Sequence, residues 1–282
     1  MLNITNEQFD RVRSLSLSLA GIQLSERHRE LLVSRCRRLK IEDPASLNEL
    51  LGAAEKGDGP ARQRLIGLFT TSHTGFFRNP GHFAIASDHA LRAIHKRGRA
   101  RLWSAAAATG EEPYSLAIAL IDAALRDDPP VTILATDINS QVLEFAKRGE
   151  YSEVSLRSLD TGQRDRFFSE SAGSGNWRIS RTAGRLIEFR ELNLHSEIWP
   201  VDGPFDVVLC RNLLMYLDTH HRHLVLQRMA SLIAPDGLLI LDPAEQLGKS
   251  SHLFGSGSNG VYPRHTAQQG GSGTIRIRHW KE

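Results

Sequence analysis

The sequence predicts an α/β fold: a doubly wound, mostly parallel sheet that follows a small all-helical N-terminal domain and carries a small antiparallel β insertion. Three observations predict it. Residues 1–75 show only helical periodicity, as expected of a helical domain and its linker. From about residue 100 onward, short apolar runs alternate with amphipathic stretches, which is typical of parallel β-α-β units. At about residues 165–192 a glycine-rich stretch interrupts this alternation and indicates the insertion.

Helix start signals divide the N-terminal domain into four helices. Thr5, with Gln8 three positions later, fits a capping box. Ser25 is placed to cap a second helix, and Asp43-Pro44 supplies a cap and a first-turn proline for a third. The run Gly57-Asp58-Gly59-Pro60 ends the third helix and precedes the fourth. We therefore expect a small bundle of short helices.

The main sheet, within residues 76–282, is expected from four short apolar runs. These strands are residues 101–105, 131–135, 205–210 and 238–241. Helical patterns follow the first strand at residues 113–125 and precede the last at 221–232. Residues 177–180 and 186–189 are expected to form the antiparallel insertion around Ala183-Gly184. We also expect a final strand at residues 274–279.

Composition excludes several classes of protein. With 40% hydrophobic residues, the 282-residue chain can bury a large core, which excludes disorder as its main state. The 35 Lys and Arg against 32 Asp and Glu leave a net charge of +3, too small to indicate nucleic acid as a partner. No apolar run approaches the roughly 18 residues of a membrane span, and the N-terminus lacks a basic-then-apolar signal. We expect a cytoplasmic protein with no membrane insertion.

No metal site is expected. Cys36 and Cys210 lie in segments with helix and strand patterns that are far apart in the chain. The histidines at positions 220, 221 and 223 lack the spacing to a carboxylate that a zinc-binding helix uses. A solvated helix start after Asp218 accounts for them.

Residues 102–114 lead from an expected strand into a helix through a run of small side chains. Such a run lets a ligand approach the backbone and the helix N-terminus. The run lacks the spaced glycines of a dinucleotide site, and Glu111 and Glu112 stand where a pyrophosphate needs amide donors. A cationic, phosphate-free nucleoside is therefore favoured. In the alternative interpretation, the two glutamates only complement the helix dipole.

Asp137 closes the second expected strand, 27 residues after Gly110. A carboxylate at this strand tip is where a nucleotide-binding sheet binds ribose hydroxyls. Considered alone, Asp137 is equally suited to cap the helix of residues 140–148. Together with the small-residue run, the ribose interpretation is favoured.

Five motifs occur in order along nearly the whole chain. They are Thr74-Gly75-Phe76-Phe77-Arg78; Trp103-Ser104-Ala105-Ala106 through Glu111-Glu112-Pro113-Tyr114; Ala135-Thr136-Asp137-Ile138; Phe205-Asp206-Val207-Val208-Leu209-Cys210-Arg211-Asn212 with Tyr216; and Pro235-Asp236-Gly237-Leu238. Together they resemble the CheR family of chemotaxis receptor methyltransferases, which use S-adenosylmethionine (SAM) to esterify glutamate side chains of receptors. The resemblance implies a Rossmann-like, SAM-dependent methyltransferase sheet, with S-adenosylhomocysteine (SAH) as the product.

The resemblance also implies a set of site residues. Those expected around SAM are Thr74, Arg78, Ala105, Glu111, Asp137, Asn193, Leu194, Arg211 and Asn212. Arg78 and Tyr216 are expected near the transferred methyl group, where Arg78 is suited to hold a carboxylate and Tyr216 to orient either reactant. The alternatives are a surface cation and an aromatic packed at the mouth of the strand.

The chain departs from the family pattern at two places. Ser72 stands where the family has Asn, and Asp242-Pro243-Ala244-Glu245 stands where it has Gly-His-Ser-Glu, so that only Glu245 matches. The chemistry implied by the resemblance needs no general base, because a glutamate carboxylate is already ionised at pH 7. Accordingly, we see no His/Asp or Cys/His pair near the motifs.

A basic stretch indicates how a partner is bound. Residues 27–40 contain six Lys or Arg and one acid, and on a helix Arg29, Arg37 and Lys40 fall near one another, opposite an apolar stripe that includes Leu31. The resemblance implies that this face docks on the cytoplasmic helical bundle of a chemoreceptor; the alternative is a solvated face. The sequence leaves open whether the insertion binds a receptor tail.

Two other functions stay in competition: a methyltransferase acting on RNA or a small molecule, and a non-catalytic SAM-binding adaptor. An aromatic content of 7% counts against RNA. The sequence does not identify the receptor, the modified glutamates, the behavioural output or the oligomeric state. It also leaves open whether the native chain extends beyond Glu282.

Overall fold

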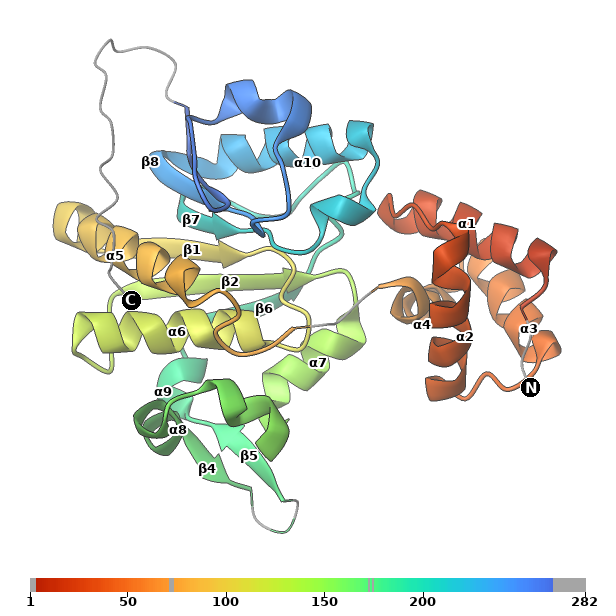
Figure 1. The fold of residues 1–282 in the computed structure, drawn as a ribbon, viewed down its shortest axis with the longest axis horizontal. Coiled ribbons are helices and arrows are strands. Elements are labelled where there is room, and N and C mark those ends of the chain that lie inside the picture. The colour runs from red at the N-terminus through yellow and green to blue at the C-terminus, as the bar shows by residue number, and fades with distance from the viewer. Residues whose placement is uncertain (1–3, 71–73, 172, 174, 266–282) are drawn as a thin grey trace.

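A six-stranded sheet forms the centre of the computed structural model, which describes residues 4–70, 74–171, 173 and 175–265 (Figure 1). The strand order is β6-β2-β1-β7-β8-β9, and every neighbouring pair is parallel except β8 with β9. The strands are β1 (Ala100–Ser104), β2 (Val131–Asp137), β6 (Ile187–Glu191), β7 (Phe205–Leu209), β8 (Ile233–Ile240) and β9 (Val261–Pro263). The expected α/β fold with a mostly parallel sheet is confirmed.

Helices cover both faces of this sheet. They are α5 (Pro80–Arg97), α6 (Glu111–Ala124), α7 (Ser140–Arg148) and α10 (Thr219–Leu232). Because side chains alternate along a strand, neighbouring residues of β1 enter different cores. Leu102 belongs to the core that contains Ala90 of α5, and Trp103 to the core that contains Met229 of α10. This two-sided burial explains why adjacent residues of the central strands, such as Leu102-Trp103 and Val207-Val208-Leu209, are apolar.

The N-terminal segment forms a bundle of four helices. They are α1 (Asn6–Ala20), α2 (Arg29–Arg38), α3 (Pro44–Glu55) and α4 (Gly59–Phe69), with a short 3₁₀ turn, η1 (Glu26–His28), before α2. The Thr5 capping box is present, and Asp43 caps α3 as expected. Asp58, for which no cap was predicted, caps α4. Ser25 precedes η1, so the cap expected for the second helix stands one turn earlier than α2.

The bundle lies beyond the carboxyl ends of the central strands (Figure 1). Polar contacts hold it there: Asn193 Nδ2 donates to the Leu19 carbonyl at 2.7 Å, and Gln63 Nε2 donates to a carboxylate oxygen of Glu191 at 2.7 Å. Ile22 and Leu217 add an antiparallel bridge between the end of α1 and the loop before α10. The sheet and bundle therefore enclose the edge at which ligands bind in open parallel sheets.

The basic face expected on the second helix is only partly present. Arg29 is engaged within the bundle: its guanidinium bonds Glu26 at 3.0 Å and the Ile4 carbonyl at 2.9 Å, and lies 4.3 Å from the ring centre of Phe9. Leu31, expected in the apolar stripe, is instead 39% exposed. Arg29 therefore belongs to the scaffold of the bundle, and Arg35 is buried, whereas Arg37 and Arg38 at the end of α2 stay exposed.

The antiparallel insertion exists, but its expected strand pairing is wrong. The small sheet has the order β3-β5-β4, made of β3 (Glu150–Ser152), β5 (Asn176–Ile179) and β4 (Phe168–Glu170). Between these strands lie η2 (Glu153–Ser158) and α8 (Thr161–Phe167), and α9 (Arg181–Gly184) follows them. The run at residues 186–189 belongs to the main sheet instead, where Phe189 of β6 pairs in parallel with Ala135 of β2.

The reason for this error is that an alternating run of five residues suits either sheet, and only the available partner strand decides between them. The small sheet accordingly begins at Glu150 and ends at Ile179, not at residues 165 and 192. The strand expected at residues 274–279 lies outside the described residues. None of the helices in the described part of the chain has the length and apolar character needed to cross a membrane.

Candidate active site

A pocket lies between the carboxyl ends of the central strands and the N-terminal bundle. The space between the lining atoms is about 1070 Å³, part of which is open to solvent. Nine of the expected site residues line it: Thr74, Arg78, Ala105, Asp137, Asn193, Leu194, Arg211, Asn212 and Tyr216. The bundle contributes Ala20, Ile22, Phe69 and Thr70, which the sequence analysis did not assign to the site. Their only sequence signal was their place at helix ends.

The loop after β1 supplies a wall of small side chains. Ala105, Ala106 and Ala108 line the pocket, and Ala108 has a φ of +46° in the left-handed region. Gly110 follows with a φ of +98°, and a Cβ there would lie 2.8 Å from Ala146 and from the Tyr151 hydroxyl. Glycine is therefore required at position 110 both for its conformation and for the close approach of α7. The small-residue run leaves the backbone accessible to a ligand.

Asp137 stands at the end of β2 and supports this loop. Its Oδ2 accepts a hydrogen bond from the Ala108 amide at 2.9 Å, and its Oδ1 accepts one from the Asn139 amide at 2.9 Å. Asn139, and not Asp137, caps α7, because its side chain accepts from the Gln141 amide. The helix-cap alternative for Asp137 is therefore wrong. Burial raises the pKa of Asp137 although these amide bonds oppose the shift.

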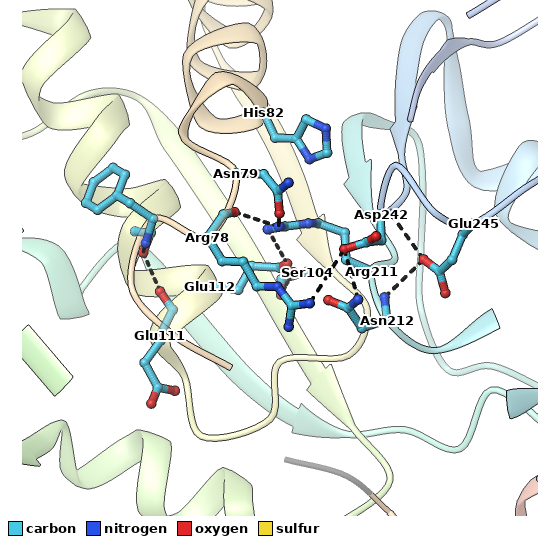
Figure 2. A network of polar contacts seen from close by, with 12 residues as sticks. Arg78, Asn79, His82, Ser104, Glu111, Glu112, Arg211, Asn212, Asp242 and Glu245 are labelled. Carbon is cyan, nitrogen blue, oxygen red and sulfur yellow. Dashed lines mark hydrogen bonds and ion pairs between the residues drawn. The ribbon is translucent and has the colours of Figure 1, made fainter. Parts of the chain in front are cut away.

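The two glutamates at the start of α6 have different surroundings. Glu111 does not line the pocket: its carboxylate accepts from the Thr109 hydroxyl at 2.6 Å. Figure 2 shows its side chain pointing away from the polar network that surrounds Glu112. Glu112 does line the pocket and accepts from the Ser104 hydroxyl at 2.8 Å. Of the two glutamates, only Glu112 is therefore in the pocket lining.

Arg211 joins the segment before α5 to the centre of the sheet. Its Nη1 lies 3.1 Å from Glu112 Oε2, and its Nη2 donates to Asn79 Oδ1 at 2.6 Å and to the Arg78 carbonyl at 2.5 Å. Asn79 has a φ of +62°, and this hydrogen bond helps hold it in that unfavourable conformation. Burial raises the pKa of Glu112, and the charge of Arg211 opposes that rise. The buried pair positions the backbone that carries Arg78.

Arg78 and Tyr216 both line the pocket and come from different parts of the chain. The Arg78 side chain is 42% exposed, and its Nη2 lies 3.9 Å from Asp242 Oδ2. Tyr216 ends the 3₁₀ turn η3 (Leu214–Tyr216), and its carbonyl accepts from the Gln23 amide of the bundle at 2.9 Å. A cation and a phenol thus line the same pocket.

His195 also lines the pocket, which the sequence analysis did not predict. Its ring centre lies 4.5 Å from that of His221, whose Nδ1 lies 2.5 Å from Asp218 Oδ2. A His/Asp pair therefore stands beside the site, contrary to expectation, although neither of its members lines the pocket. Burial lowers the pKa of His195, and the neighbouring His221 lowers it further. Within the described residues, no group of three His, Cys, Asp or Glu side chains is placed to hold a metal ion.

Comparisons with known proteins identify the family of the chain. The family model of the CheR methyltransferase SAM-binding domain matches residues 72–261. Chemotaxis protein methyltransferase 2 of Pseudomonas aeruginosa is 37% identical over 261 residues, which cover 92% of this chain and 93% of the relative. The chemotaxis protein methyltransferases of Salmonella typhimurium and Escherichia coli are 35% and 34% identical over 265 residues, covering 93% of this chain and 91% and 92% of theirs.

The residues of the pocket fit SAM. The carboxylate of Asp137 can accept from ribose hydroxyls, and the alanines after β1 leave room for a nucleoside. The acids at this edge suit a cationic ligand without phosphates, since Glu112 stands where a pyrophosphate would need donors. The chain belongs to the CheR methyltransferase family and is a SAM-dependent methyltransferase.

Proposed function

We propose that this enzyme transfers the methyl group of SAM to glutamate side chains of chemoreceptors and so forms methyl esters. The observation that carries the proposal is the partly exposed guanidinium of Arg78 in the pocket lining, together with Tyr216. A guanidinium is suited to bind a carboxylate acceptor. The relatives named chemotaxis protein methyltransferases support the assignment to chemotaxis. Because the acceptor is the cytoplasmic part of a receptor, the proposal places the enzyme in the cytoplasm.

The proposed chemistry depends on alignment more than on proton transfer. SAM supplies, when bound, a methyl group on a sulfonium. A glutamate carboxylate is ionised at pH 7 and needs no base, so the chain must align the reactants at about 3 to 3.5 Å and exclude water. Arg78 holds the acceptor carboxylate, and the bundle shields the pocket. The Tyr216 side chain, which lines the same pocket as Arg78, orients a reactant.

We assign the cofactor contacts to residues of the pocket lining. Asp137 binds the ribose, and Glu112 takes the place first expected for Glu111. Arg211 acts by fixing the backbone at Arg78, since its terminal nitrogens bond Glu112, Asn79 and the Arg78 carbonyl. The remaining proposed contacts are Thr74, Ala105, Asn193, Leu194 and Asn212.

We further propose that the exposed end of α2 docks on the acidic helical bundle of the receptor. Arg37, Arg38 and Lys40 are exposed there, while Arg29 is engaged with Glu26 and the Ile4 carbonyl. Opposite charge on two surfaces accelerates association and fixes their orientation. The edge strands of the small sheet offer backbone groups to an extended receptor tail, and a tail-less receptor tests that contact.

Transfer of tritium from methyl-labelled SAM to chemoreceptor-containing membranes tests the proposed function. We expect label on the receptor that is released by mild base, because methyl esters hydrolyse readily and methyl amines do not. Stable label, or label on RNA or a small molecule, would indicate another methyltransferase. SAM binding without transfer to any acceptor would indicate an adaptor. Tyr216→Phe serves as a graded control, with lower turnover and unchanged SAM affinity expected.

A further inference from the structure

The turn after β8 places a buried carboxylate behind two residues of the pocket. Asp242 does not line the pocket, and only 8% of it is exposed. Its Oδ2 accepts a hydrogen bond from Asn212 Nδ2 at 2.9 Å and lies 3.9 Å from Arg78 Nη2. Its Oδ1 accepts from the Ala244 amide at 3.0 Å. Figure 2 shows this carboxylate directed toward both Arg78 and Asn212.

This contact decides which way the Asn212 amide faces. An ionised carboxylate only accepts hydrogen bonds, so Asn212 must direct its NH₂ group toward Asp242 and its carbonyl oxygen the other way. Figure 2 shows the amide nitrogen on the side of Asp242. Asn212 lines the pocket, and it therefore presents a fixed hydrogen-bond acceptor to a ligand.

A second acid holds the backbone of the same two residues. Glu245 Oε2 accepts from the Asn212 amide at 3.0 Å and from the Asp242 amide at 3.1 Å. Asn212 needs such support because its φ is +58°, in the left-handed region. Besides accepting from the Ala244 amide, the Asp242 carboxylate contacts two side chains of the pocket, the amide of Asn212 and the guanidinium of Arg78.

The surroundings keep Asp242 ionised. Burial by itself raises the pKa of this carboxyl group. The hydrogen bonds from Ala244 and Asn212, together with the charges of Arg78 and Arg211, outweigh burial and lower its pKa overall. The group is therefore an acceptor and an anion throughout the physiological pH range.

We propose that Asp242 is a positioning residue of the methyltransferase site, which sets the Asn212 amide with its carbonyl oxygen toward the ligand and restrains the Arg78 guanidinium. The acceptor so formed suits the ammonium group of SAM, and the restrained cation suits a carboxylate. This inference rests on the proposed ligand contacts of Asn212 and Arg78. It extends the site to a residue that touches neither reactant.

Two substitutions separate the hydrogen bond to Asn212 from the negative charge beside Arg78. Asp242→Asn removes the charge but still offers a carbonyl oxygen to Asn212 Nδ2, whereas Asp242→Ala removes both. In calorimetric titrations with SAM and with SAH, we expect Asp242→Ala to weaken binding about ten-fold, and Asp242→Asn to stay within about two-fold of the wild type. Both variants should lower kcat on receptor, because each removes the carboxylate charge beside Arg78. The matched control is Asp236→Ala, an exposed acid paired with Lys96, which should change neither quantity.

A double-mutant cycle with Asn212→Ala tests whether Asp242 affects SAM binding through Asn212. If Asp242 acts through Asn212, Asp242→Ala should not weaken SAM binding further in the Asn212→Ala background. Additive losses, or wild-type binding and kcat in Asp242→Ala, would overturn the inference while the proposed contact of Asn212 stands. Wild-type SAM affinity in Asn212→Ala would refute that contact, and the inference with it. Should Asp242→Ala not fold, a ten-fold loss of SAM affinity in the isosteric Asp242→Asn would also overturn it.

Discussion

Replacing Asp137 by alanine removes the proposed ribose contact and, together with it, a support of the loop after β1. The carboxylate accepts from the amides of Ala108 and Asn139, both at 2.9 Å, and lines the pocket. A charge-assisted hydrogen bond contributes about 1.5 to 3 kcal/mol, so loss of the ribose contact should weaken SAM binding about 10- to 150-fold. Ala108 sits at a φ of +46°, and without its tether the loop is free to relax. We therefore expect a loss in the upper part of that range.

Calorimetric titration with SAM and with SAH measures this effect. Asp137→Asn should lie between alanine and wild type, because an amide keeps one acceptor oxygen for the two backbone donors. The matched control is Asp160→Ala, which removes an acid that accepts from the Gln163 amide at 2.8 Å and does not line the pocket. It should cost stability but leave SAM affinity unchanged.

The affinity of the wild type should also depend on pH. Burial raises the pKa of Asp137, so the carboxylate becomes protonated at a higher pH than the value of about 3.9 of an ordinary aspartate. The ionised form makes the stronger bond to a hydroxyl, and SAM affinity should therefore decline as the pH falls through this raised pKa. Wild-type affinity in Asp137→Ala at neutral pH would refute the assignment of Asp137 to the site.

Three further predictions concern other parts of the molecule. Arg78→Ala should lower kcat on receptor about 100-fold while changing SAM affinity far less, as measured by initial rates and titration. Reversal of Arg37 and Lys40 to Glu should raise the KM for receptor and flatten its salt dependence, whereas Arg29→Glu should mainly lower the Tm. Burial raises the pKa of Glu112, so the stability contributed by its protonation is fully present below about pH 4.3 and is lost as the pH rises through the folded-state pKa. Glu112→Gln should therefore gain stability relative to the wild type as the pH rises, in thermal unfolding across a pH series.

Each of these predictions has a contrary outcome. Wild-type turnover by Arg78→Ala would remove that residue from the reacting centre. An unchanged KM and salt slope in the Arg37 and Lys40 reversal would leave the end of α2 as a solvated face. A stability difference between Glu112→Gln and wild type that is constant with pH would show that burial does not control this carboxyl group.

Much of the local structure follows from the sequence alone. The caps at Thr5 and Asp43 occur where predicted, because a cap depends on a side chain and an amide two or three residues away. The position of the pocket is also predictable. Its motifs follow β1, β2 and β7, and the carboxyl ends of parallel strands meet at one edge of a sheet whatever the details of packing.

The tertiary structure alone decides which of several suitable side chains takes part. Glu111 and Glu112 are adjacent acids that the sequence alone does not distinguish. Their side chains point about 100° apart around the helix axis, and in the structure it is Glu112 that contacts Arg211, 99 residues later. The basic pattern of α2 likewise does not show that Arg29 folds back on Ile4 and Phe9. The sequence likewise does not show that β6 pairs with β2, or that Asp242 contacts Asn212. These features depend on contacts between residues far apart in the chain, which periodicity and capping patterns do not encode.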